Sequence, residues 1–258
     1  MAARILVVED NLVNQRVAHD ALRKANYDVD VVANGQEALH AAAATDYDLI
    51  LLDWQMPVMD GFETIRALRA RPQTAEVKVL AMTANVMSGD RERCLAAGMD
   101  DHIGKPIAPS ALLERVAYWL GRQRTAGCAQ EAPAMRDRAG LVDPSVLEEL
   151  ATLEDDAGAA LLRDLTVLIR ETIAQAEPEL EEALGAREWA RLAQAAHALK
   201  SSTTTLGLRS LAKACCVLEH LAREGSALEA ELSLASLRQL VVPSLAAMDA
   251  VVAELLDR

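Results

Sequence analysis

The stretch LILLDWQMPVMDG, residues Leu49–Gly61, decides the fold of the first half of the chain. Four consecutive large aliphatic residues are typical of a strand buried on both faces of a parallel sheet. Pro57 and Gly61 then end the strand. Asp53 therefore stands at the carboxyl end of a buried strand, where a loop begins. A charge in such a place needs a partner, a metal ion or a chemical role.

Residues 1–121 repeat this alternation of strand and helix. Short apolar runs predict strands at Ile5–Val8, Val29–Val32, Leu49–Leu52 and Val77–Met82, with a weaker one at His102–Ile103. Amphipathic stretches predict helices near 12–25, 35–44, 62–70, 86–97 and 109–120. Five strands alternating with five helices predict an α/β domain with a doubly wound, five-stranded parallel sheet. Functional side chains of such sheets lie at the carboxyl ends of the strands.

The second half has a different pattern. Residues 122–140 lack periodicity and are interrupted by Gly127 and Pro133, which predicts a linker. Residues 141–258 contain no strand pattern and form a predicted all-α domain. Its expected helices lie near 144–151, 156–185, 187–206, 208–224 and 229–256. Long amphipathic helices with short connections predict an antiparallel four-helix bundle.

Composition excludes several classes of protein. The 258 residues carry a net charge of -13, and a nucleic-acid binder would be expected to show a basic face. Uncharged apolar stretches stay shorter than the roughly 20 residues of a transmembrane helix, so we expect no membrane span. The sequence shows no signal-peptide pattern. The four cysteines form no C-x-x-C pair, which indicates reduced thiols in a cytoplasmic protein.

Polar residues follow four of the predicted strands. They are Glu9-Asp10, Asp53, Thr83-Ala84 and Lys105-Pro106. Carboxylates brought to one sheet edge repel one another, and a hard divalent cation such as Mg²⁺ would relieve that repulsion. A lysine and a hydroxyl group nearby would neutralise a phosphoryl group placed there. The central carboxylate could then attack phosphorus and become an acyl phosphate.

The motifs ILVVEDN, LILLDWQMPVMDGFE, LAMTAN and DDHIGKPI resemble the receiver domain of two-component response regulators. The resemblance covers residues 1–121 and implies a flavodoxin-like fold with Asp53 as the phospho-acceptor. It implies Mg²⁺ as the cofactor, held by Glu9, Asp10, Asp53 and the backbone carbonyl of Gln55. It also implies that Thr83 and Lys105 contact the phosphoryl group. His102 stands where the family usually has a Tyr or Phe that swings inward, so the usual aromatic switch is not predicted.

A second motif, AAHALKSST at residues 195–203, lies within a predicted helix. Helical spacing places Leu199 on the core stripe and His197 beside it, towards solvent. Lys200 and Ser201 follow His197 by three and four residues, on the same face. An exposed imidazole can act as a nucleophile near neutral pH. The lysine would stabilise a phosphoryl group on that imidazole.

This motif and the following LGLRSLAKACCVLEHL resemble the histidine-containing phosphotransfer (Hpt) domain over roughly residues 143–256. Ser201 replaces the usual glycine. The resemblance implies that His197 is the phospho-histidine and that Lys200 assists it. Both halves together resemble the C-terminal part of a hybrid sensor kinase. The expected partners are a histidine kinase and an upstream or downstream receiver.

The leading interpretation is a phosphorelay protein, and two alternatives stay open. In the first, the receiver gates a partner of the bundle and His197 is idle. In the second, the chain is a phosphatase with an aspartyl nucleophile, which usually needs a second acid two residues later, where this chain has Gln55. ATP-binding kinase motifs are absent from the sequence. We therefore expect no turnover beyond self-phosphorylation and dephosphorylation at Asp53.

Overall fold

The computed structural model describes residues 2–83, 90–105, 107–121, 140–152 and 158–257. The chain divides into two compact units, Met1–Asp137 and Arg138–Arg258, which are treated separately below. The first unit alternates strands and helices, whereas the described part of the second contains helices only. The predicted α/β plus all-α fold class is therefore confirmed. The predicted linker lies outside the described residues except for Gly140.

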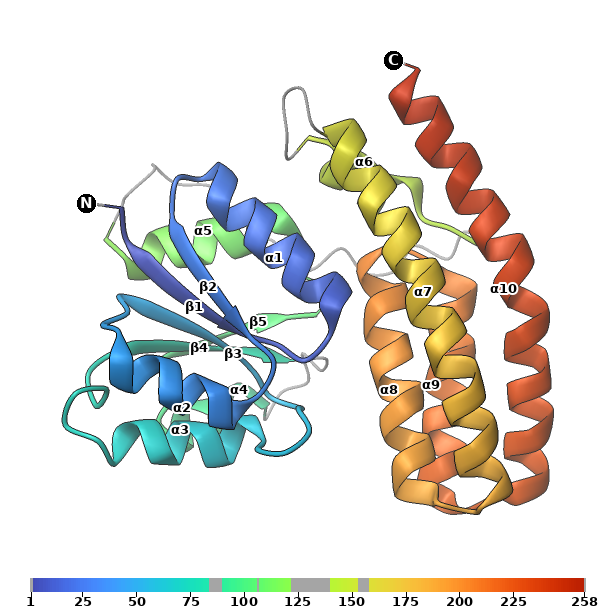
Figure 1. Cartoon of the computed structure of the whole chain (residues 1–258), viewed down its shortest axis with the longest axis horizontal. Helices are drawn as coiled ribbons and strands as arrows, with labels where there is room; N and C mark the ends of the chain where they lie inside the picture. Colours follow the sequence, from blue (N-terminus) through green and yellow to red (C-terminus); the bar gives the residue numbers. More distant parts are fainter. Residues whose placement is uncertain (1, 84–89, 106, 122–139, 153–157, 258) are drawn as a thin grey trace. The chain divides into compact units, whose positions relative to one another are not determined.

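The first unit is built on a five-stranded parallel sheet (Figure 1). Its strands are β1 (Arg4–Val8), β2 (Asp28–Val32), β3 (Leu49–Asp53), β4 (Lys78–Thr83) and β5 (Asp101–Gly104). Their order in the sheet is β2-β1-β3-β4-β5, with Val8 of β1 aligned with Leu52 of β3. The winding direction of the chain reverses between β1 and β3. The carboxyl ends of these two strands therefore flank the switch point, where ligands bind in open α/β sheets.

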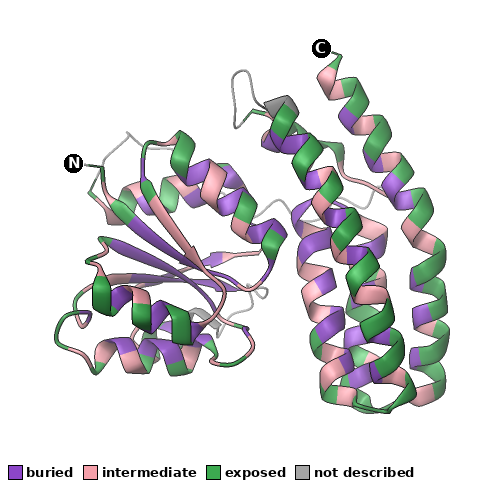
Figure 2. Cartoon of the chain, in the orientation of Figure 1, coloured by how far each residue is buried: buried purple, intermediate pink, exposed green. Residues whose placement is uncertain are grey.

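Helices cover both faces of this sheet (Figure 1). One face carries α1 (Leu12–Lys24) and α5 (Pro109–Trp119), and the other carries α2 (Gly35–Ala44), α3 (Gly61–Arg69) and α4 (Asp90–Ala96). All residues of β3 are buried, whereas edge strand β2 is only partly buried (Figure 2). The continuous aliphatic run of β3 thus reflects packing against helices on both faces.

Local chemistry fixes where the helices nearest Asp53 begin. Asn11 caps α1 by accepting hydrogen bonds from the backbone N–H groups of residues 13 and 14. Asp60 and Glu63 form a reciprocal capping box at the start of α3. A Cβ atom at Gly61 would lie 2.6 Å from the carbonyl oxygen of Asp53. Only glycine lets α3 begin directly against the end of β3.

The second unit is a helical bundle (Figure 1). Its helices are α6 (Pro144–Ala151), α7 (Gly158–Gly185), α8 (Trp189–Thr205), α9 (Arg209–Glu224) and α10 (Ala227–Leu256). Helices α7 to α10 pack in a ring, each against the next, and α10 closes onto α7. Gly207 and Gly225 adopt left-handed backbone conformations at two of the connections. These are two of the helix breaks that the sequence predicted.

Element boundaries differ from the expected ones by a few residues. β5 is longer than predicted because its main-chain pairing with β4 extends beyond the two apolar residues. α4 begins at Asp90 and α7 at Gly158, and the residues expected to precede them lie outside the described ranges. Ala84 and Pro106, expected to follow β4 and β5, are also outside those ranges.

Within the described ranges, α10 is long and apolar enough to cross a membrane, judged by length and composition alone. Its most apolar window has a mean hydropathy of 1.6, and 28% of that window is buried. Core helices of bundles give the same signal. Two ion pairs, Arg170–Asp249 and Arg238–Glu181, join α10 to α7. The expected absence of a membrane span stays a prediction.

Candidate functional site

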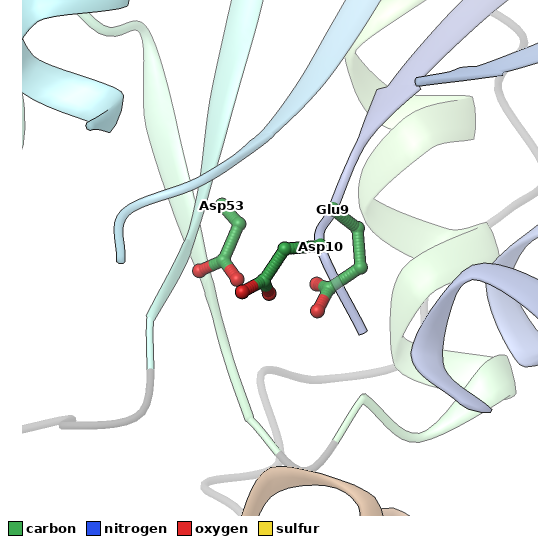
Figure 3. Close-up of side chains that lie close together, drawn as sticks. All are labelled: Glu9, Asp10 and Asp53. Atoms are coloured by element: carbon green, nitrogen blue, oxygen red, sulfur yellow. The ribbon is translucent and has the colours of Figure 1, made fainter. Parts of the chain in front are cut away.

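Three carboxylates gather at the carboxyl edge of the sheet (Figure 3). Glu9 and Asp10 directly follow β1, and Asp53 is the last residue of β3. One carboxylate oxygen from each residue lies within 4.8 Å of the others. Neighbouring parallel strands end at the same edge, so the cluster is a direct consequence of the sheet order. The structure therefore brings together the carboxylates that the sequence singled out.

Lys105 reaches this cluster from the end of β5. Its Nζ atom donates a hydrogen bond to Oδ2 of Asp53 at 2.7 Å and lies 2.7 Å from Oε2 of Glu9. Its backbone N–H donates to the carbonyl oxygen of Thr83, which is a buried residue at the end of β4. Only 9% of the Lys105 side chain is exposed. The ends of four strands thus form one largely buried charged site.

The electrostatics of the cluster are dominated by burial. Glu9 is 1% exposed, and burial raises the pKa of its carboxyl group to about 8, with the Asp53 charge adding to the rise. The ammonium group of Lys105 and the amide of Asn14, which donates to Glu9 Oε1 at 2.9 Å, only partly offset this. Burial alone would lower the pKa of Lys105. The charges of Glu9 and Asp53 nevertheless hold it above its usual value.

The donor set fits a hard divalent cation. Three carboxylates face a single lysine, and oxygen ligands of this kind suit Mg²⁺. Oε2 of Glu9 is buried and accepts no hydrogen bond of normal geometry from the described residues, although Lys105 lies close. Glu9, Asp10 and Asp53 could therefore hold the ion. The backbone N–H of Gln55 donates to Oδ1 of Asp53 at 3.2 Å, and the role of its carbonyl oxygen stays a prediction.

An aromatic pair joins the residue after Asp53 to α3. The rings of Trp54 and Phe62 meet edge to face with centroids 4.7 Å apart. The guanidinium group of Arg93, on α4, lies 5.0 Å from the Trp54 centroid and 5.7 Å from that of Phe62. Trp54 directly follows Asp53, so changes at the end of β3 are expected to reach the surroundings of its indole ring.

His102 is half-buried on β5, where it is aligned with Ala81 of β4. Its Nδ1 atom is buried without a hydrogen-bond partner among the described residues and lies 3.7 Å from Oδ1 of Asp101.

The second candidate site lies on α8, beside its buried stripe. His197 was expected beside this stripe, towards solvent, and it is partly exposed there, with 19% of its side chain accessible. Lys200 is 22% exposed and lies one turn further on, as predicted. The motif is partly buried because α9 packs closely against α8.

Sequence reasoning missed Glu219, the residue on α9 that organises this site. Its Oε1 atom lies 3.0 Å from Nδ1 of His197, and its Oε2 atom accepts a hydrogen bond from Lys200 at 2.6 Å. Arg223 also donates to Glu219. The available signal was an acidic residue between Leu218 and Ala222 on the apolar face of a helix. An acid in that position needs cationic partners.

Burial by itself would raise the pKa of the Glu219 carboxyl group. The hydrogen bonds and charges of His197 and Lys200 outweigh burial and hold that pKa at about 2. A carboxylate at Nδ1 favours the tautomer that carries its proton there. Nε2 of His197 is then left with a free lone pair and can act as a nucleophile.

Two family models match the chain. The model of the response regulator receiver domain matches residues 5–117, and that of the Hpt domain matches residues 161–256. The chain is a receiver domain followed by an Hpt domain. The order and identity of the two domains agree with the sequence prediction.

Some curated relatives match more than four fifths of this chain within longer proteins. The sensor protein GacS of Pseudomonas syringae pv. syringae is 29% identical over 87% of this chain and 25% of its own length. The aerobic respiration control sensor protein ArcB of Escherichia coli K12 is 31% identical over 81% of this chain and 27% of its own. The chain therefore spans about a quarter of the length of these relatives.

Solved receiver domains match the first half alone. The receiver domain of the sensor histidine kinase PA1611 from Pseudomonas aeruginosa PAO1, crystallised with a magnesium ion in its active-site cleft, is 42% identical. The match covers 47% of this chain and 99% of that one, with a TM-score of 0.44. The chemotaxis response regulator CheY4 of Vibrio cholerae is 30% identical over 46% of this chain and 99% of its own, with a TM-score of 0.45.

The Hpt motif keeps its helix despite a run of poor helix formers. The run Ser201–Thr205 contains only hydroxyl residues. The hydroxyl of Thr203 donates to the carbonyl oxygen of Leu199 at 2.8 Å, and that of Thr204 donates to Lys200 at 2.6 Å. These bonds to the preceding turn satisfy the buried hydroxyl groups without breaking the helix.

Proposed function

We propose that Asp53 accepts a phosphoryl group from a histidine kinase or an Hpt partner and that His197 is the phosphotransfer histidine. The observation that carries the proposal is the contact of Lys105 with Asp53 at an edge where Glu9 and Asp10 also converge. The buried carboxylate of Asp53 therefore contacts the ammonium group of Lys105 and also belongs to the candidate metal site. These are the elements that stabilise a transferring phosphoryl group.

The step at Asp53 is an in-line displacement. A carboxylate oxygen forms a bond to phosphorus while the bond between phosphorus and the donor's imidazole nitrogen breaks. The electron pair of that bond returns to the nitrogen. Lys105 then pairs with the phosphoryl oxygens, and the hydroxyl of Thr83, at the end of the neighbouring strand, donates to one of them. Mg²⁺, when bound by Glu9, Asp10 and Asp53, would neutralise further negative charge on the phosphoryl oxygens.

His197 acts through its Nε2 atom. Glu219 keeps the proton on Nδ1 and fixes the orientation of the ring. Lys200 lies on the same face, where its ammonium group attracts the phosphoryl group of a phosphorylated receiver. Glu219 also holds Lys200 near His197, because Oε2 of its carboxylate accepts a hydrogen bond from the lysine ammonium group while Oε1 lies at Nδ1 of His197. The three side chains therefore form one unit.

The partners follow from the domain types. Receiver and Hpt domains take part in phosphorelays with histidine kinases and with other receivers. We propose that the chain meets such partners in the cytoplasm as part of a hybrid sensor kinase. The composition supports this view and disfavours a nucleic-acid partner, since acidic residues exceed basic ones by 39 to 26.

The proposal is tested by mapping phosphate after treatment with two small donors. Acetyl phosphate with Mg²⁺ should label Asp53, and borohydride reduction of the product should yield homoserine at that position alone. Phosphoramidate should label His197. The Asp53→Asn variant should lose the first modification and keep the second, and the His197→Gln variant should show the reverse. Labelling of another receiver residue in the Asp53→Asn variant would show that the acceptor is wrongly assigned.

A further inference from the structure

Val58 has a costly backbone conformation for its residue type. Its φ angle is 70°, in the left-handed region that β-branched residues rarely adopt. Its side chain is 76% exposed, so burial within the receiver does not compensate for the strain. Such outliers persist where the surrounding structure imposes them, and they concentrate at functional sites.

The surroundings of Val58 do impose this conformation. The backbone N–H of Met59 donates to the carbonyl oxygen of Pro57, and that of Gly61 donates to Trp54. These bonds close the loop between β3 and α3 across the end of the strand that carries Asp53. Val58 therefore lies with an exposed side chain in the loop that leaves the acceptor strand, five residues after Asp53.

A second exposed aliphatic side chain follows β1, the other strand that supplies the cluster. Leu12 is the first residue of α1, two residues after Asp10, and is 56% exposed. Asp53 itself is buried at this edge. In-line transfer requires the reacting atoms to approach to about 3–3.5 Å. A histidine carried on a rigid helix must therefore bring its flanking residues close to the loops that follow β1 and β3.

The Hpt domain of this chain shows what such a helix presents. Ala193 and Ser201 lie one turn before and one turn after His197, and both are small and partly exposed. Small residues beside a nucleophilic histidine leave room for a branched aliphatic side chain. A bulky or charged residue there would collide with it.

We propose that Val58 is a specificity-determining contact of the receiver. It packs against small residues next to the phosphorylated histidine of a helical partner, and it selects for partners of that kind. The inference rests on the proposed function and adds to it a residue that takes no part in the chemistry. Val58 matters for a donor that must dock, and it is irrelevant to a small-molecule donor.

The test compares two donors on one acceptor. The protein donor is the Asp53→Asn chain phosphorylated at His197 with phosphoramidate, and the small donor is acetyl phosphate. The acceptors are the His197→Gln chain with and without Val58→Asn, since asparagine tolerates a positive φ and is not β-branched. Val242→Asn, which replaces a valine of 75% exposure on α10, is the matched control in the same background.

We expect Val58→Asn to raise the acceptor concentration for half-maximal transfer from the protein donor about five- to tenfold, because an apolar contact is lost. Labelling by acetyl phosphate should be unchanged, and Val242→Asn should match the unsubstituted acceptor in both assays. Relief of strain should also raise the thermal midpoint of Val58→Asn by about 2–4 °C.

Other outcomes separate the two proposals. Equal transfer to the Val58→Asn acceptor would overturn the specificity inference and leave the proposed function intact. A parallel loss of acetyl phosphate labelling would show that Val58 shapes the site, which also overturns the inference. If no phosphate passes from the phosphorylated donor to the His197→Gln acceptor that keeps Val58, the result counts against the relay itself. An unchanged thermal midpoint would contradict the premise of strain.

Discussion

Nδ1 of His197 lies 3.0 Å from Oε1 of Glu219, a residue 22 positions later on the next helix. This contact joins a nucleophile on α8 to a buried carboxylate on α9, and the same carboxylate holds Lys200. The chemistry of the Hpt domain therefore depends on the packing of two helices as well as on the motif around the histidine.

We expect Glu219→Ala to slow phosphorylation of His197 by phosphoramidate. A hydrogen bond to a charged group contributes about 1.5–3 kcal/mol, which corresponds to about ten- to hundredfold in rate. Glu219→Gln should retain part of the rate because its amide oxygen can still accept the Nδ1 proton. The control is Glu224→Gln, at an exposed position on the same helix. Equal rates for Glu219→Ala and the control would refute the positioning role.

Glu219 should also make the stability of the bundle depend on pH. The pKa of this carboxyl group is about 2 in the folded chain and 4.5 in the unfolded one, so the unfolded state binds more protons between these values. Its stabilising contribution is present above pH 4.5 and is lost as the pH falls towards 2. A loss of about 2–4 kcal/mol is expected over that range. Urea unfolding of the wild type and Glu219→Gln should converge in acid, and parallel curves would contradict the assignment.

The edge cluster could be predicted from the sequence because topology alone brings it together. Parallel strands end at one edge, so Glu9, Asp10, Asp53 and Lys105 had to converge once their strands were recognised. The distances followed from the register of the strands. What the pattern did not indicate was the degree of burial of Glu9, which depends on how α1 covers the end of β1.

The pairing of His197 with Glu219 could not be predicted in the same way. Helical periodicity tells which residues share a face of one helix, but it does not fix which residues of two packed helices meet. The expectation that His197 lies beside the core stripe came from α8 alone and carried no information about α9. The approach of α9 buries most of the imidazole and supplies its carboxylate partner.

Gly61→Ala should disturb the receiver at the phosphorylation site. A Cβ atom there would lie 2.6 Å from the carbonyl oxygen of Asp53 and 2.9 Å from Cα of Trp54, and neither backbone atom can move freely. We expect a loss of about 1–3 kcal/mol in stability and slower labelling of Asp53 by acetyl phosphate. Gly185→Ala, where a Cβ atom would meet nothing within 4 Å, is the matched control. Unaltered stability and labelling of Gly61→Ala would contradict the close approach.

Lys105→Met should destabilise the receiver in the absence of divalent cations. The substitution leaves the buried carboxylates of Glu9 and Asp53 without their cation, at an expected cost of about 3–5 kcal/mol. Added Mg²⁺ should recover part of the loss by supplying positive charge, and the exposed Lys24→Met should behave like the wild type. Thermal denaturation with and without Mg²⁺ measures both effects. A Lys105→Met chain as stable as the control would show that the carboxylates do not depend on this lysine.

Mg²⁺ binding should be visible in the fluorescence of Trp54. Trp54 directly follows Asp53, so an ion held by Asp10 and Asp53 is expected to change the surroundings of its ring, which contacts Phe62 and Arg93. Affinity should be weak because few protein ligands are present and the ion keeps several waters. Trp54→Phe should remove the signal, which identifies the reporter among three tryptophans. Asp10→Ala should abolish the titration while Trp54 remains. If Asp10→Ala titrates like the wild type, the ion is held elsewhere and Asp10 is not its ligand.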